Sequence, residues 1–197
     1  DGDGQESKDY VERFLDATKS TMLFARGVIL VEGISEQILL PTLAEELGYS
    51  LADEHIAVVA LGGRTFKHFL PLFGALQENE EFALNRKVAC VVDADPKQQE
   101  GENRYTNCYP YQVGEEDREQ SRVVDTLEQY ASGTPNIGIF RAEKTLEYDL
   151  AKANPNSDLL VTSFCSYASQ LRSLALDESL GTELQEKIAD QEEELSA

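Results

Sequence analysis

The chain has 197 residues, 41% of them hydrophobic, which is enough for one large α/β domain with a core of its own. Its formal net charge of −20 argues against a general polyanion-binding protein, because phosphate contacts normally need Lys and Arg. Its apolar runs are strand-sized, which excludes a membrane span of about 20 residues. Its three cysteines, Cys90, Cys108 and Cys165, are widely separated, which favours a reducing cytoplasm over a disulfide framework.

The chain begins with a helical pattern that leads into a strand. A loose stripe of apolar residues predicts a helix over residues 7–24. The apolar run over residues 26–32 then predicts a buried strand, which Gly33 ends. Ser35 is a good N-cap for the helix that follows, and Gly48 is a suitable residue for its end.

Two more strands are predicted in the middle of the chain. The first covers residues 56–61 and the second covers residues 88–92. Between them lies a predicted helix over residues 65–76 that contains Pro71, so we expect a kink or a break there. The polar stretch over residues 96–117, rich in Gln and Glu, is expected to be a loop or a surface insert.

A fourth strand and further helices complete an alternating order of elements. A short helix is expected over residues 123–130, the strand over 136–140, and a loop entering a helix over 143–150. Residues 157–195 are expected to be helical and become increasingly acidic. Strands that alternate with helices predict an α/β fold with a four-stranded, mainly parallel sheet flanked by helices.

Carboxylates stand where two of the buried strands end. Glu32 follows the first strand, and Asp93 and Asp95 follow the third. The carboxyl ends of parallel strands open into the crevice where ligands bind, so these side chains are expected to lie close together. Crowded negative charge is unfavourable unless a cation relieves it, and hard cations prefer oxygen ligands. The pattern therefore predicts a magnesium or manganese site, which Glu36 in the first turn of the next helix would join.

Each of these features also has a purely structural interpretation. Glu36 would then only complete the start of its helix and favour the helix dipole. Asp93 and Asp95 share one side of an extended segment, since they are two residues apart, but an acidic turn gives the same pattern. The spacing of His55 and His68 matches no metal motif.

The motifs taken together resemble a Toprim domain, the metal-binding α/β module of topoisomerases, bacterial primases and several nucleases. The stretch from Leu23 to Gly33, continued by Glu36-Gln37-Ile38-Leu39-Leu40-Pro41, resembles more specifically the OLD (overcoming lysogenization defect) family. The likeness runs from about Met22 to Leu150, and it includes Leu61-Gly62-Gly63, the Asp93/Asp95 pair and residues 145–150. It implies a Rossmann-like Toprim sheet with an added helical C-terminal region.

The resemblance implies a DNA endonuclease that nicks or cleaves phosphodiester bonds with two divalent ions, Mg²⁺ or Mn²⁺. The implied catalytic residues are Glu32, Asp93 and Glu147, and the implied metal ligands are Glu32, Glu36, Asp93, Asp95 and Glu147. Reserve positions are Glu143, Lys144 and Asp149, while Arg64 and Lys67 would line a DNA path. Independently of any family, two metals about 3.5 to 4 Å apart suit phosphodiester hydrolysis, because they activate the attacking water and stabilise the leaving oxygen.

The resemblance also implies a larger protein, in which an ABC-type ATPase domain precedes the Toprim nuclease. We expect residues 1–25 to form a helix and linker, 26–155 the Toprim domain, and 156–197 a C-terminal helical region. The sequence contains no Walker motif, so ATP hydrolysis would need the other domain. A homodimer is expected by analogy alone.

One departure from the family pattern keeps an alternative open. OLD nucleases also use a Lys near the C-terminal end of the Toprim region, whereas Lys187 sits in no recognisable motif. Lys144 lies near the predicted site and is the other candidate. The alternative is therefore a non-catalytic, metal-binding Toprim-like module for assembly or DNA binding. A receiver-type domain, in which an Asp accepts phosphate, ranks third because it leaves the Glu32 and Glu36 pair unexplained.

Overall fold

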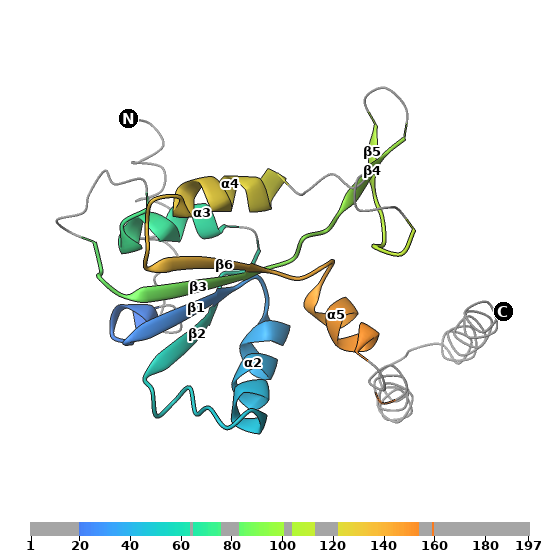
Figure 1. The fold of residues 1–197 in the computed structure, drawn as a ribbon. Helices are drawn as coiled ribbons and strands as arrows, with labels where there is room; N and C mark the ends of the chain where they lie inside the picture. The colour runs from blue at the N-terminus through green and yellow to red at the C-terminus, as the bar shows by residue number, and fades with distance from the viewer. Residues whose placement is uncertain are drawn as a thin grey trace, which may run out of the picture. The chain divides into compact units, whose positions relative to one another are not determined.

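A four-stranded parallel sheet forms the centre of the fold (Figure 1). The computed structural model describes residues 20–63, 65–75, 83–100, 104–112, 122–153 and Leu159. The strand order is β2-β1-β3-β6, and the strands are β1 (Gly27–Val31), β2 (Ile56–Ala60), β3 (Lys87–Val92) and β6 (Ile137–Arg141). The predicted α/β class and parallel sheet are therefore confirmed.

Helices cover both faces of this sheet (Figure 1). Helix α2 (Ile34–Glu46) lies on one face and packs on β2, whereas α3 (Phe66–Phe69) and α4 (Arg122–Ala131) lie together on the other. Two short 3₁₀ helices, η1 (Ser20–Leu23) and η2 (Leu70–Phe73), and the helix α5 (Leu146–Lys152) complete the described helices. Among the described helices, none has the length and apolar character that a membrane crossing requires.

The core lies where the central strands meet the aromatic side chains of α3 and η2. Phe66, Phe69 and Phe73 are fully buried, and they belong to one cluster with buried residues of β1 and β3. Burial alternates along β3, and Val28 and Leu30 alternate likewise in β1, so these residues point to one face of the sheet, whereas the buried Val31 points to the other. Such side chains supply most of the hydrophobic stabilisation of the domain.

The helix that contains Pro71 breaks as predicted. The α-helical turns of α3 end at Phe69, and the chain continues as the 3₁₀ helix η2, which carries Pro71 in its first turn. Pro71 has no N–H to donate within a longer α-helix, so the change of helix type removes the conflict. Gly74, at φ 90°, then ends η2 in the left-handed conformation.

Two local predictions are wrong. The N-cap of α2 is Gly33 rather than Ser35, because the helix starts one residue before Ser35, at Ile34. The polar stretch after β3 is not all loop: it contains an antiparallel hairpin of β4 (Lys97–Gln99) and β5 (Tyr105–Asn107). These strands are too short and too polar to show an alternating apolar pattern.

The chain divides into two units, Asp1–Leu146 and Glu147–Ala197. The first unit contains the sheet and the hairpin, and the described part of the second consists of residues 147–153 and Leu159. The N-terminal helix predicted over residues 7–24 is described only from Ser20, where it is a 3₁₀ turn. The predicted helical region 157–195 lies outside the described residues apart from Leu159.

Cys90 gives the first testable prediction. It is buried in β3, and burial raises the pKa of its thiol from 9.0 to about 12. We expect iodoacetamide at pH 8 to leave Cys90 unmodified in the folded protein and to modify it in urea, as measured by peptide mass spectrometry. Because the folded pKa is the higher one, this thiol's contribution to stability is complete below about pH 9 and declines towards pH 12. Equal modification rates with and without urea would contradict the burial.

Candidate metal and catalytic site

The candidate site lies between the carboxyl ends of β1 and β3, where the order of the strands in the sheet reverses. The chain places β2 on one side of β1 and then returns to place β3 on the other side. In open parallel sheets, ligands bind at the carboxyl ends of the strands at such a switch point. Glu32 follows β1 there, and Asp93 follows β3.

The structure brings Glu32 and Asp93 together. Val31 pairs with Val91, so the residue after β1 lies beside the end of β3. The Glu32 carboxylate reaches across, and its Oε1 accepts a hydrogen bond from the Asp93 backbone N–H at 3.2 Å. Both residues are half-buried. A carboxylate held in place by a backbone N–H has a fixed position, as a metal ligand needs.

The two glycines that follow β2 connect this strand to Glu32. The Gly63 N–H donates to the Glu32 carbonyl oxygen at 2.9 Å. Gly62 and Gly63 have φ values of 74° and 128°, which side-chain-bearing residues rarely adopt. An added Cβ would meet no heavy atom within 4 Å at either glycine, so conformation rather than space requires glycine here. The backbone of Glu32 is thus held from β2 as well as from its own strand.

Glu36 is turned towards the start of its own helix. Its side chain is only 7% exposed, and its Oε2 accepts a hydrogen bond from the Gly33 N–H at 3.1 Å. This contact completes one half of a capping box and satisfies a backbone donor at the N-terminus of α2. A Cβ on residue 33 would lie 3.1 Å from the same oxygen, so Gly33 also allows the close approach. The geometry therefore matches the structural interpretation of Glu36.

The backbone at Asp95 departs from the extended conformation that the sequence suggested. Asp95 has φ 39°, in the left-handed region, where Asp is tolerated better than most residues. Its N–H donates to the Lys144 carbonyl oxygen at 3.2 Å, and the Ala142 N–H donates to the Val92 carbonyl oxygen at 3.0 Å. These bonds tie the segment after β3 to the segment after β6, which carries Glu143 and Lys144.

The Lys144 side chain extends to the β4–β5 region. Its Nζ donates to the Cys108 carbonyl oxygen at 3.3 Å and lies 4.5 Å from the centroid of the Tyr109 ring. Tyr109 and Tyr111 are stacked, with centroids 5.5 Å apart. These tyrosines are not among the predicted site residues, because the sequence does not show the hairpin that brings them to Lys144.

The other predicted positions are described only in part. Lys67 is exposed on α3, whereas Arg64 and Lys187 lie outside the described residues. Glu147 and Asp149 are in the first turn of α5 and belong to the second unit, where Glu147 is exposed and Asp149 half-buried. Their functional roles remain predictions.

The donor chemistry fits a divalent cation, and the ligand set is incomplete. In the part of the chain that the structure describes, no group of three or more His, Cys, Asp and Glu side chains is placed to hold a metal ion. Glu32 and Asp93 offer oxygen ligands at one sheet edge, which suits Mg²⁺ or Mn²⁺. Further ligands would come from water, substrate or other carboxylates, of which Glu36, Asp95 and Glu147 are the predicted ones.

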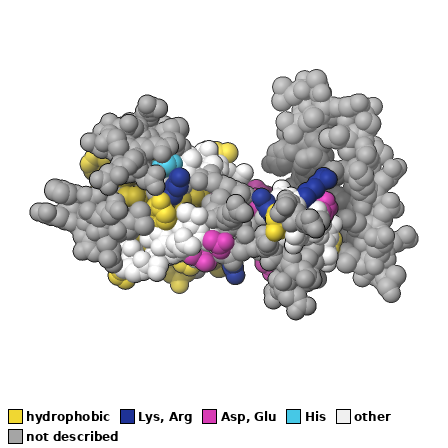
Figure 2. Space-filling view, turned by 90° about the horizontal axis from the view of Figure 1, so that it is seen from above, with side chains coloured by type: hydrophobic (Ala, Val, Ile, Leu, Met, Phe, Trp, Pro, Cys, Tyr) yellow, Lys and Arg dark blue, Asp and Glu magenta, His cyan; other side chains and the backbone are white. Residues whose placement is uncertain are grey.

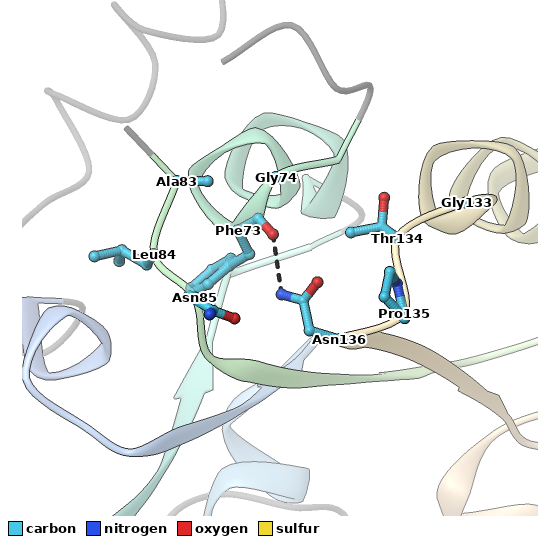
Figure 3. A pocket seen from close by; sticks show the side chains of 9 residues that line it. All are labelled: Phe73, Gly74, Ala83, Leu84, Asn85, Gly133, Thr134, Pro135 and Asn136. Carbon is cyan, nitrogen blue, oxygen red and sulfur yellow. Dashed lines mark hydrogen bonds between the residues drawn. The ribbon is translucent and has the colours of Figure 1, made fainter. Parts of the chain in front are cut away.

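A pocket of about 320 Å³ lies at the opposite, amino-terminal edge of the sheet (Figure 3). It is formed by the turn after η2 and by the segments that precede β3 and β6, and none of its lining residues is titratable. The Asn136 side chain donates to the carbonyl oxygens of Phe73, at 3.0 Å, and Arg86, at 2.8 Å. Asn136 thus fixes three segments at this edge, and the described residues that line the pocket include no acid–base group.

Thr134, in the wall of this pocket, gives a stability prediction. Its buried Oγ1 has no hydrogen-bond partner among the described residues, and an unsatisfied buried hydroxyl is destabilising. Replacement by the isosteric Val is expected to raise the free energy of unfolding by about 1 kcal/mol, measured by urea denaturation. The exposed Thr42→Val is the matched control and should change it by less than about 0.5 kcal/mol. A loss of stability in Thr134→Val would show that the hydroxyl has a partner.

The described surface does not compensate for the acidity of the chain. Figure 2 shows basic and acidic side chains interspersed on the face that it displays. With a net charge of −20, nucleic acid would have to be held by local features rather than by a general basic surface.

Comparisons with known proteins place this geometry in a family context. Residues 23–95 match the overcoming lysogenization defect protein-like (OLD-like) TOPRIM domain. The chain is similar in structure to the C-terminal region of the Xanthomonas campestris pv. campestris OLD protein, with 24% identity, a TM-score of 0.53, and coverage of 85% of this chain and 73% of that one. For the C-terminal region of the Burkholderia pseudomallei OLD protein the values are 24%, 0.51, 85% and 74%. The comparison with curated proteins gives no match.

Proposed function

We propose that this chain, which contains an OLD-like TOPRIM domain at residues 23–95, is the metal-dependent DNA-cleaving part of a nuclease. The observation that carries the proposal is the contact between Glu32 and the Asp93 backbone at the switch point of the sheet. Two strands remote in sequence deliver acidic side chains to the edge where parallel sheets bind ligands. The family match makes phosphodiester cleavage the reaction that best uses them.

Glu32 and Asp93 would hold the first divalent cation, Mg²⁺ or Mn²⁺. When bound, such ions lower the pKa of a bound water and stabilise the negative charge of the leaving oxygen. The protein's role would be to hold this ligand residue in place, since the Asp93 N–H binds the Glu32 carboxylate and the Gly63 N–H binds the Glu32 carbonyl oxygen. Glu36, Asp95 and Glu147 are the proposed additional ligands for a two-ion site. Glu36 accepts the Gly33 N–H through Oε2, so its other carboxylate oxygen would be the one that binds metal.

The proposed partners are DNA and an ABC-type ATPase domain. The chain itself has no Walker motif, so nucleotide hydrolysis would regulate the nuclease from another domain. A homodimer is part of the same proposal and rests on analogy.

The proposal is tested with supercoiled plasmid DNA and the purified chain. We expect conversion to nicked or linear DNA in Mg²⁺ or Mn²⁺, and none in EDTA. Isothermal calorimetry with Mn²⁺ should detect binding in the absence of DNA. Failure to bind Mn²⁺ and to cleave DNA at high protein concentration would refute it.

A non-catalytic metal-binding or assembly module is the second candidate. It is favoured by the side chain of Lys144, which contacts Cys108 and Tyr109, because the cleavage mechanism calls for a cation near the carboxylates. Binding of Mn²⁺ without any cleavage would select this function instead.

A further inference from the structure

We propose that Tyr109 and Tyr111 form a stacking platform for unpaired bases of a DNA strand that passes the candidate site. The inference rests on the proposed function, because that strand would be the substrate of the nuclease. We refer to Tyr109, Tyr111 and Lys144 as the platform. Its two tyrosines lie in the turn that follows β5 and its lysine follows β6, all in the same unit as Glu32 and Asp93.

Hydrogen bonds attach the platform to the segment that carries Asp95. The Cys108 N–H donates to the carbonyl oxygen of Pro96 at 3.0 Å, and Pro96 is the residue directly after Asp95. Lys144 makes a second connection, since its carbonyl oxygen accepts from the Asp95 N–H at 3.2 Å while its Nζ donates to the Cys108 carbonyl oxygen at 3.3 Å. The platform is therefore held next to one of the carboxylate-bearing segments of the site.

The two rings are arranged in advance and open to solvent. The Tyr109 N–H donates to Gln112 Oε1 and the Gln112 N–H donates to the Tyr109 carbonyl oxygen, both at 2.9 Å, which closes a tight turn around them. The rings stack with an interplanar angle of 24°. Tyr111 is 66% exposed and Tyr109 44% exposed. Two large aromatic side chains held in solvent are unfavourable unless a ligand covers them, and a fixed geometry reduces the entropy lost when it does.

Charge makes a nucleic acid the fitting ligand. Lys144 lies 4.5 Å from the Tyr109 ring, and the hairpin adds the exposed Lys97 and Arg104. Arg104 is only weakly paired, 3.9 Å from the exposed Glu100. Proteins bind single-stranded nucleic acid through cations that lie beside stacked aromatic rings, because the bases stack on the rings and the phosphates contact the cations. An acidic chain has reason to bind DNA through such a local feature rather than through a broad basic surface.

The experiment measures binding of a fluorescein-labelled oligothymidylate by anisotropy in EDTA, where cleavage cannot occur. Tyr111→Ala is expected to weaken binding about tenfold, because stacking of one base is lost. Tyr111→Phe, which keeps the ring, should stay within about twofold of the wild type. Tyr49→Ala is the matched control: Tyr49 is 70% exposed but follows α2, outside the platform, and its removal should leave binding unchanged. The chain contains no Trp but eight Tyr, so the difference in tyrosine quenching between the wild type and Tyr111→Ala reports stacking on Tyr111.

The outcomes separate this inference from the proposed function. Equal binding by Tyr111→Ala and wild type, with both variants folded by circular dichroism, would overturn the platform, even if metal-dependent cleavage is found. Selective weakening in Tyr111→Ala would support the platform, even if the protein does not cleave DNA. An equal loss in Tyr49→Ala and Tyr111→Ala would also overturn it, because general surface effects would then explain the change.

Discussion

Replacement of Glu32 by Gln is expected to lower the rate of metal-dependent DNA cleavage at least about a hundredfold, because removal of a metal ligand's charge weakens both ion binding and transition-state stabilisation. In the unsubstituted protein the Asp93 N–H donates to Glu32 Oε1 at 3.2 Å, and Gln keeps a side-chain oxygen that can accept the same hydrogen bond. The sheet should therefore remain intact, and the loss should be one of chemistry. The measurement is the initial rate of plasmid nicking at saturating Mg²⁺, with circular dichroism as the folding check.

The matched control for this variant is Glu45→Gln, which removes the same charge from an exposed position near the end of α2. It should cleave at the wild-type rate. Asp93→Asn should lose as much activity as Glu32→Gln, and the double variant should be little slower than either, because residues that hold one ion act as a unit. Wild-type rates in both Glu32→Gln and Asp93→Asn would eliminate this site.

Replacement of Phe69 by Ala is expected to lower the free energy of unfolding by about 3 to 5 kcal/mol. Phe69 is 0% exposed and lies in an aromatic-rich cluster between α3, η2 and the central strands. Truncation to Ala removes the buried ring and leaves a cavity that close-packed neighbours fill only partly. Because a typical domain has only about 5 to 15 kcal/mol of stability, the variant should be partly unfolded at physiological temperature. Urea denaturation followed by circular dichroism measures the change.

Phe24→Ala tests whether burial, and not the aromatic ring itself, causes that loss. Phe24 is 83% exposed after η1, so its truncation should change the free energy of unfolding by less than about 0.5 kcal/mol. If both variants lost similar stability, the core would have been placed incorrectly.

The sheet was predictable because its strands are apolar on both faces. The run Val28-Ile29-Leu30-Val31 and its counterpart over residues 88–92 have no other stable place than the middle of a covered sheet. Pro71 likewise marked the break between α3 and η2, since proline has no N–H to donate within an α-helix, although α2 continues through Pro41. The hairpin of β4 and β5 was missed because backbone pairing can form between polar residues that leave no periodic pattern.

The candidate site was predictable only to the level of which strand ends carry carboxylates. The orientation of a carboxylate side chain depends on the hydrogen-bond donors around it, and the sequence does not show where those donors lie. Glu36 illustrates this, because its carboxylate binds the N–H of Gly33, a donor that only the folded backbone presents to it. Asp95 illustrates the backbone equivalent: a bond to the Lys144 carbonyl oxygen accompanies a left-handed φ that no simple alternation rule describes. The tyrosines beside Lys144 became meaningful only with the hairpin in view.

The contact between Glu32 and Asp93 joins residues 61 positions apart, across parallel strands. Pairing of this kind forms late in folding, because a long stretch of chain must first give up its freedom before any hydrogen bond compensates. A nascent or partly denatured chain therefore lacks the paired carboxylates altogether. DNA cleavage of the proposed kind would therefore depend on a completed tertiary structure, and a folding intermediate would lack it.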